Sequence, residues 1–245
     1  MDFTIEELTM NAWPSLQTLL LDGWIIRMAG GYTKRANSVN PIYSFDKNID
    51  EKIMYCENIY KKNNLPAIYK IVECDEYKIL DKRLEELNYE KIDITSVQIY
   101  NGIKEINCGK ENIIIDNIFS ENWKNCFFYC NNIKDNITIE IINNMLKNIL
   151  HKIISVYKME NGIFIGCGYG VIEKDFVGLF DIVVKEEYRG KGYGKEIVES
   201  ILAKANETGV KKAHLSVVNN NIIAKNMYEK IGFKEIYKYW YRKKD

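Results

Sequence analysis

The second half of the chain carries a regular succession of hydrophobic patterns. Apolar residues return every three or four positions in its helix-like segments, which is typical of amphipathic helices. β-branched and other apolar residues fill the segments between them and predict strands, and Asn161-Gly162 predicts a hairpin turn. The predicted strands are 113–116, 151–159, 163–173, 176–184, 211–218 and 233–243, and the predicted helices are 120–131, 135–150, 195–209 and 219–232. The pattern therefore indicates an α/β (α+β) fold with a sheet flanked by helices.

The glycine-rich stretch 188–195 (YRGKGYGK) lies between a predicted strand and a predicted helix. The first turn of a helix presents backbone N–H groups that have no internal partner, and glycines let a ligand approach the backbone closely. Together with Arg189, Lys191 and Lys195, this position favours an anion-binding loop over a merely flexible turn. The glycine spacing fits neither the dinucleotide fingerprint nor the Walker pattern.

The pattern Arg189-x-x-Gly192-x-Gly194, after a strand that ends in Ile-Val-Val, resembles the acyl-CoA signature of the GNAT superfamily of N-acetyltransferases. The segment 215–233 (LSVVNNNIIAKNMYEKIGF) resembles the downstream motif of that family, so the resemblance covers about residues 111–245. It implies the GNAT fold, with a mixed, mostly antiparallel twisted sheet, and acetyl-CoA as co-substrate. The implied cofactor-binding residues are Ile182, Val183, Val184, Arg189, Gly190, Lys191, Gly192, Tyr193, Gly194, Lys195 and Asn221.

The same resemblance implies an acyltransferase that moves an acetyl group from acetyl-CoA to a primary amine by direct attack in a ternary complex. Tyr228 stands at the position often assigned as the general acid, although simple packing of the ring also fits. Asn221 lies near the cofactor in the family pattern and also fits a helix cap. Some members carry a glutamate where this chain has Ser216, so the base is expected elsewhere. Asp181 and Glu173 are the carboxylates to test, unless both are solvated strand residues.

Two other classes of function stay open beside the enzyme. The departure at Ser216 permits a CoA-binding sensor or pseudoenzyme that does not turn over. A non-catalytic interaction protein built from decayed units is disfavoured by the intact loop and downstream motif. The acceptor is equally open, since the sequence does not choose between an amino acid, a polyamine, an aminoglycoside and a peptide or protein N-terminus.

The first half of the chain repeats the order of the second. LEELNYEKI (84–92) resembles YEKIGFKEI (228–236) at an offset of 144 residues, and the same offset aligns 57–71 with 201–215 as helix, turn and strand. The agreement lies in the order of the patterns more than in identities. We therefore predict a duplicated GNAT-like unit.

The first copy lacks the functional parts of the second. The place of the glycine loop is taken by YSFDKNID (43–50), which has no glycine, and the tyrosine position is Leu84. We predict a degenerate N-terminal domain at 1–105, a catalytic domain at 106–245 and one cofactor per chain. Two repeats in one chain can mimic the pairing of a dimer, which favours a monomer and leaves a dimer as the alternative.

The segment 23–41 (GWIIRMAGGYTKRANSVNP) is locally rich in glycine, basic residues and asparagine. A strand, a Gly-Gly turn and a second strand explain this composition without a functional role. The alternative is that Arg27, Arg35 or Asn37 faces the cleft between the halves and serves the substrate side.

The composition limits the classes of molecule that the protein is expected to bind. Lys+Arg and Asp+Glu both number 34, so the neutral chain has no overall attraction to nucleic acid or to an anionic membrane. None of the six cysteines forms a Cys-x-x-Cys pair, and the two histidines lie far apart, so no metal is expected. The first 24 residues resemble neither a signal peptide nor a membrane span. Reduced thiols and these features predict a cytoplasmic protein that acts on a small-molecule or peptide amine.

Overall fold

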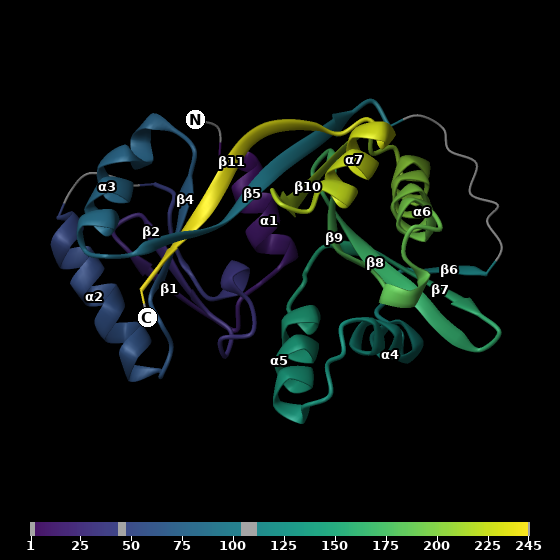
Figure 1. Cartoon of the computed structure of the whole chain (residues 1–245), viewed down its shortest axis with the longest axis horizontal. Helices are drawn as coiled ribbons and strands as arrows, with labels where there is room; N and C mark the ends of the chain where they lie inside the picture. Colours follow the sequence, from purple (N-terminus) through teal and green to yellow (C-terminus); the bar gives the residue numbers. More distant parts are fainter. Residues whose placement is uncertain (1–2, 44–47, 104–111, 245) are drawn as a thin grey trace.

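The computed structural model describes residues 3–43, 48–103 and 112–244, and within them eleven strands form one continuous sheet (Figure 1). The strand order is β1-β2-β3-β4-β11-β5-β10-β9-β8-β7-β6. The strands are β1 Gln17–Leu21, β2 Trp24–Met28, β3 Val39–Pro41, β4 Ile68–Val72, β5 Glu90–Asn101, β6 Ile113–Asp116, β7 Lys152–Glu160, β8 Ile163–Glu173, β9 Phe176–Val184, β10 Lys212–Val218 and β11 Lys234–Lys243. The α-helices are α1 Thr4–Ala12, α2 Ile49–Lys62, α3 Lys78–Glu86, α4 Glu121–Cys130, α5 Asn136–Lys147, α6 Tyr193–Glu207 and α7 Ile222–Ile231.

The internal repeat predicted from the sequence is present in the structure. The first residues of α2 and α6, of β4 and β10, of α3 and α7, and of β5 and β11 are each 144 positions apart. All but two of the strand pairings are antiparallel, and the two parallel ones, β3 with β4 and β9 with β10, are equivalent under the repeat. The mixed, mostly antiparallel sheet with two pseudo-repeated units is therefore confirmed.

The two repeats exchange their last strands. β11 pairs with β4 on one side and β5 on the other, while β5 also pairs with β10. The final strand of each half thus lies inside the sheet of the other half (Figure 1). The predicted domain boundary between residues 105 and 106 falls in 104–111, outside the described residues.

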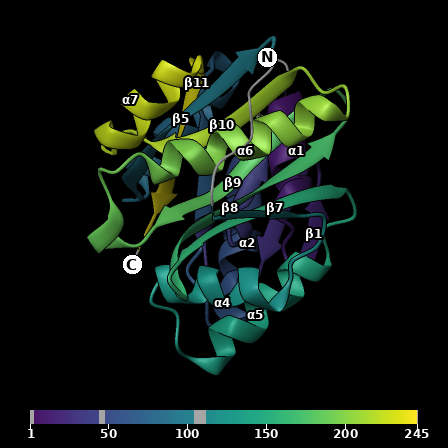
Figure 2. The same ribbon diagram turned by 90° about the vertical axis from the view of Figure 1, so that its right-hand side faces the viewer.

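The second half of the sheet is covered on both faces (Figure 2). One face packs on α6 and α7 through a cluster that contains Ile197, Ile201 and Tyr228. The opposite face packs on α4 and α5 through a cluster that contains Trp123 and Tyr169. The predicted helices 120–131 and 135–150 are observed, with the second ending at Lys147. Because each core cluster belongs to one face, residues on opposite faces of β9 have separate surroundings.

Candidate active site

The sheet of the second half opens between β9 and β10. These parallel strands pair only from Phe176 to Leu179 on β9, opposite Lys212 to Leu215 on β10. Beyond that point β9 stays paired with β8 but has no further register with β10 among the described residues. The last residues of β9 therefore keep one hydrogen-bonding edge for another partner.

A bulge at Asp181 marks the start of this opening. The register between β8 and β9 shifts between Cys167 and Tyr169, and Asp181 has a left-handed backbone with φ +49°. A non-glycine residue in that region carries backbone strain and indicates a special local role. The bulge re-aims the side chain of Asp181 just where the two strands part.

The glycine loop follows directly at the open end of β9. Arg189 Nε donates to the carbonyl oxygen of Val184 at 3.1 Å and ties the loop to the strand. Gly190 and Gly192 have φ of +79° and +88°, and a Cβ added at either would meet no atom within 4 Å. Their conformation, and not crowding by other protein atoms, requires glycine there. The open space beside this backbone fits a ligand that approaches it closely.

The helix begins earlier than the sequence pattern predicted. α6 starts at Tyr193, so Tyr193, Gly194 and Lys195 form its first turn and point their amides at the loop. A Cβ on Gly194 would lie 3.4 Å from Met227 Sδ of α7. That distance is an ordinary van der Waals contact, so packing against α7 does not by itself require glycine at this position.

The basic side chains around the loop are exposed and weakly held. Lys195 Nζ lies 3.5 Å from Glu199 Oε1, and Lys191 Nζ lies 5.2 Å from the Tyr188 ring centre. The Tyr193 hydroxyl donates to Glu160 Oε2 at 3.4 Å. Exposed pairs of this kind cost little to rearrange, so the cations remain available to an anion.

Asp181 is a largely buried carboxylate with one free oxygen. Its Oδ1 accepts a hydrogen bond from Arg35 Nη2 at 3.2 Å, and its Oδ2 is buried without a partner among the described residues. Burial raises the pKa of this carboxyl above its usual range, and the Arg35 guanidinium opposes part of that shift. A carboxylate with a raised pKa and an unused oxygen beside an opening is suited to accept a proton.

Tyr228 lies on α7, on the opposite face of the sheet from the surroundings of Asp181. Its ring is buried and packs edge-on against Phe233 with centroids 5.8 Å apart. Burial raises the pKa of the phenol, so the hydroxyl keeps its proton near neutral pH. Asn221 caps α7 by accepting a hydrogen bond from the amide of Ala224 at 3.1 Å, so its predicted capping role is observed.

Glu173 lies at the far end of the β8–β9 hairpin. It accepts hydrogen bonds from Asn11 Nδ2, the shorter at 3.0 Å, and lies 3.3 Å from His151 Nε2. Glu173 pairs with Phe176 beside the turn, whereas the glycine loop follows Val184 at the other end of β9. The two carboxylates singled out from the sequence are therefore far apart, and only Asp181 lies where the strands open.

The segment 23–41 forms β2, a Gly-Gly turn, a short 3-10 helix and β3. Asn37 is buried and holds the turn, since its Oδ1 accepts from the amides of Ala29 and Gly31 at 2.7 and 2.9 Å. Arg27 is buried and donates to backbone carbonyls. Arg35, on the 3-10 helix, reaches Asp181 in the other half. Arg27 and Asn37 thus support the backbone of this segment, as its interpretation without a functional role predicts. Arg35 instead faces the other half of the molecule.

The part of the chain that the structure describes has no candidate metal centre and no candidate membrane span. No group of three or more His, Cys, Asp or Glu side chains has an arrangement that would hold a metal ion there. Within the same residues, no helix has the length and apolar character needed to cross a bilayer.

The comparisons with known proteins show a GNAT acetyltransferase domain in this chain, together with N-acetyltransferase relatives. Residues 117–233 match the model of the acetyltransferase (GNAT) family. Residues 4–93 match a family described as "Probable histone acetyltransferase Rv0428c C-terminal". Both halves therefore carry acetyltransferase relationships, in agreement with the repeat.

Individual relatives agree with this assignment. The chain is 27% identical over 261 residues to the uncharacterized N-acetyltransferase YobR of Bacillus subtilis, covering 97% of this chain and 96% of that one. Over 78 residues it is 35% identical to the [ribosomal protein bS18]-alanine N-acetyltransferase of Haemophilus influenzae, covering 32% of this chain and 53% of the relative. A tandem GNAT protein from the clavulanic acid pathway has the same fold, with TM-score 0.64, 9% identity and coverage of 98% and 87%.

Proposed function

We propose that this acyltransferase moves an acetyl group from acetyl-CoA to a primary amine by direct attack in a ternary complex. The observation that carries the proposal is the opening between β9 and β10, which ends at the glycine loop and the first turn of α6. A strand with a free edge and a positively polarised helix start, in one line, suit an extended thiol arm that ends in a pyrophosphate.

The proposed cofactor contacts follow from this arrangement. Backbone groups of Ile182, Val183 and Val184 pair with the pantetheine arm, and amides from Gly190 to Lys195 bind the pyrophosphate, with Arg189, Lys191 and Lys195 adding charge. Asn221 contributes by fixing the start of α7. The thioester end then lies toward the bulge, because the loop marks the opposite end.

Asp181 is the proposed acceptor of the proton that the attacking amine must lose. An ammonium group is not nucleophilic, so a base has to bring the amine to its neutral form. The unpartnered Oδ2 of Asp181 lies beside the bulge, and its raised pKa brings the carboxyl closer to neutral pH. Amides of β9 next to the bulge would stabilise the charge that develops on the thioester oxygen.

Tyr228 is the proposed proton donor to the departing CoA thiolate. Its buried phenol remains protonated, and it comes from the α6–α7 face, while Asp181 belongs to the other face. The acid and the base would thus act from opposite sides of the opening. This separation suits a reaction in which one proton leaves the amine and another reaches the sulfur.

The test is acetyl-CoA consumption measured across amino acids, polyamines, aminoglycosides and short peptides. We expect turnover with one class, and we expect Asp181→Asn to lower kcat at pH 7 by roughly 100-fold or more, the range for general base catalysis. Glu173→Gln is the matched control and should keep wild-type turnover. Tight CoA binding without turnover on any amine would instead support the CoA-sensor alternative.

A further inference from the structure

A pocket of about 350 Å3 is lined by residues of both halves of the molecule, among them Arg35, which pairs with Asp181 on the adjoining strand β9. The segment 31–35 forms one wall, and strands β5, β10 and β11 form the rest. The lining includes Lys34, Arg35, Asp93, Ser216, Tyr239 and Tyr241. The size is at the lower end of small-molecule sites, so the pocket suits a compact ligand.

Two ion pairs join this wall to strands β5 and β9. Lys34 Nζ lies 2.8 Å from Asp93 Oδ2, with both side chains about 40% exposed, so solvent screens this pair. Arg35 Nη2 lies 3.2 Å from Asp181 Oδ1, and these side chains are only 29% and 13% exposed. Charges act more strongly where water is scarce, so the second pair dominates recognition of a charged ligand.

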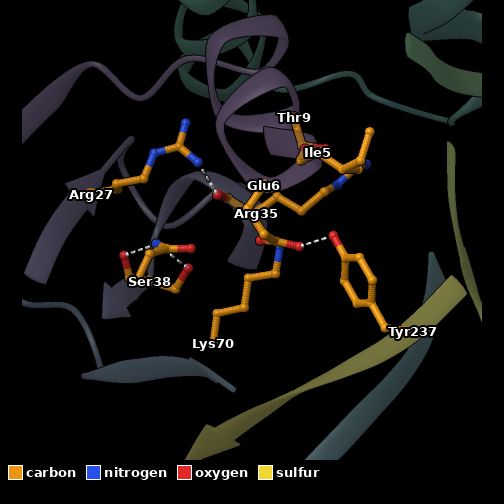
Figure 3. A network of polar contacts seen from close by, with 9 residues as sticks. Ile5, Glu6, Thr9, Arg27, Arg35, Ser38, Lys70 and Tyr237 are labelled. Atoms are coloured by element: carbon orange, nitrogen blue, oxygen red, sulfur yellow. Dashed lines mark hydrogen bonds and ion pairs between the residues drawn. The ribbon is translucent and has the colours of Figure 1, made fainter. Parts of the chain in front are cut away.

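Arg35 is held firmly by the N-terminal half. Its backbone oxygen accepts a hydrogen bond from Arg27 Nη1 at 2.7 Å (Figure 3). Arg27 also donates to the carbonyl of Met10 at 3.2 Å. The Trp13 ring centre lies 5.3 Å from the Arg35 guanidinium carbon. A guanidinium fixed in this way loses little entropy when it binds a ligand.

Binding capacity remains on both members of the Arg35–Asp181 pair. Among the described residues, Asp181 is the single side-chain hydrogen-bond acceptor for Arg35. This bond occupies one of the five N–H donors of the guanidinium. Asp181 Oδ2 is buried and unpartnered, and the Tyr241 hydroxyl, on a side chain that lines the pocket, is also without a partner among the described residues. Buried polar atoms without partners are costly, which points to a ligand that satisfies them.

We propose that the acceptor is a free α-amino acid, with its carboxylate on Arg35 and its amine on Asp181. The argument rests on the proposed function, because it places the acceptor beside the same Asp181. The Arg35 guanidinium and the Asp181 carboxylate lie in contact. They match the carboxylate and the ammonium group that an amino acid carries on its α-carbon. The unused N–H groups of Arg35 suit a carboxylate, and Asp181 Oδ2 suits an amine donor.

The charge balance distinguishes this ligand from the others. Lys34, Arg35, Asp93 and Asp181 sum to zero, and a zwitterion keeps that balance. A polyamine would add uncompensated positive charge beside Arg35 and Lys34. A peptide N-terminus offers an amine but no carboxylate on the same residue, so Arg35 would gain no ionic partner.

The experiment compares the twenty standard L-amino acids with their carboxamides in the acetyl-CoA assay on the full-length chain. Each amide keeps the amine and the side chain but loses the carboxylate charge. We expect at least one amino acid to have kcat/KM roughly 10- to 100-fold above its amide, the range for a charged hydrogen bond. Equal or better turnover of amides, polyamines or aminoglycosides would overturn this inference and leave the proposed function standing.

Variants of Arg35 separate recognition from folding. Arg35→Gln should raise KM for the preferred amino acid roughly 10- to 100-fold and change KM for its amide little. Arg35→Lys, which keeps the charge, should recover part of the difference. Arg83→Gln removes an exposed arginine at a distance and serves as the control. An equal rise of KM for acid and amide in Arg35→Gln would contradict carboxylate recognition.

If no acceptor turns over, the proposed function fails, and calorimetry then tests the pocket separately. Titrating the same amino acids and amides into protein saturated with acetyl-CoA should show binding of an amino acid that Arg35→Gln weakens. Absence of such binding would also overturn the amino acid assignment.

Discussion

The two repeats place the same backbone at the start of α2 and α6 but give it different chemistry. Asn48 precedes α2 with φ +52°, and Gly192 precedes α6 with φ +88°, so both adopt the left-handed conformation. The next positions carry Asp50 and Glu51 in the first copy, where the second has Gly194 and Lys195. The left-handed conformation directly before the helix is therefore shared by both copies, although the first copy carries acidic side chains that repel anions.

An ion pair lies at the equivalent place in the first copy. Arg83 Nε lies 2.6 Å from Asp50 Oδ1, and Arg83 corresponds to Met227, which packs beside Gly194 in the second copy. Acidic residues in a first helical turn are favourable to the helix itself. At this helix start the first copy therefore has an ion pair where the second has a glycine of the proposed pyrophosphate loop.

The largest expected effect is on CoA binding and is tested at the residue that precedes each helix, Gly192 in the second copy and Asn48 in the first. Gly192→Val should reduce CoA affinity by more than roughly 100-fold, because a β-branched residue resists φ near +88° and occupies the open space beside the loop. Asn48→Val imposes a similar strain on α2 and is the matched control. Calorimetry with CoA should show loss of binding for the first variant alone, and equal affinities for both would remove the loop from the site.

A second prediction uses the tyrosine that the first copy lacks. Tyr228→Phe should lower kcat by roughly 100-fold with little change in acetyl-CoA affinity, since the hydroxyl acts only when the thiolate leaves. Tyr89→Phe removes another buried hydroxyl, one that donates to Glu57 at 2.7 Å in the first half, and should keep wild-type turnover. Wild-type kcat in Tyr228→Phe would leave that residue with a packing role alone.

The sequence could predict the second half of this molecule because its motifs depend on local backbone requirements. Positive φ at Gly190 and Gly192 can be met cheaply only by glycine, and the strand-loop-helix order appears in the hydrophobic pattern. The duplication was also readable, since the offset of 144 brings whole elements into correspondence. These features leave a trace in consecutive residues.

The proposed acceptor pocket cannot be recognised from consecutive residues in this way. It combines Arg35 with Asp93, Ser216 and Tyr241, which are brought together by the exchange of β5 and β11. That exchange is a pairing between strands far apart in the sequence. The hydrophobic pattern of a strand does not specify which other strand it pairs with. Arg35 was one of three equal candidates because only the tertiary structure shows which one crosses to Asp181.

The repeats also differ in a buried polar position at the centre of the sheet. Lys70 on β4 is ion-paired with Glu6 at 2.5 Å, and the Tyr237 hydroxyl donates to the same carboxylate at 2.8 Å (Figure 3). The equivalent residue on β10 is His214, which lies between the rings of Phe176 and Phe180. One copy buries a paired charge and the other a neutral ring.

The third prediction follows from that difference. Burial lowers the pKa of His214 from 6.5 to about 4. Between pH 6.5 and 4 the unfolded chain therefore binds a proton at this histidine and the folded chain does not. The free energy of unfolding should therefore fall by about 3 kcal/mol as pH drops from 6.5 to 4. Urea titrations of His214→Leu should lack this part of the pH dependence, whereas His151→Gln, at a more exposed histidine, should retain it.

The fourth and smallest expected effect concerns the contact that joins the halves. Asp181 faces Arg35 and Tyr32 from the N-terminal half and Cys167 and Tyr169 from β8, and Arg35 is the cation among them. Removing that cation in Arg35→Gln should raise the pKa of Asp181 further, because the guanidinium opposes the effect of burial. The acidic limb of the kcat/KM profile should then move to higher pH for every acceptor.

This pH shift separates the positioning role of Arg35 from its proposed role in recognising the acceptor. A structural loss would lower activity at all pH values without moving the limb, whereas an electrostatic role moves the limb even for amides. Lys34→Gln removes a neighbouring cation that pairs with Asp93 instead, so its acidic limb should stay close to wild type. An unmoved limb in Arg35→Gln would show that the second half sets the protonation of Asp181 without help from the first.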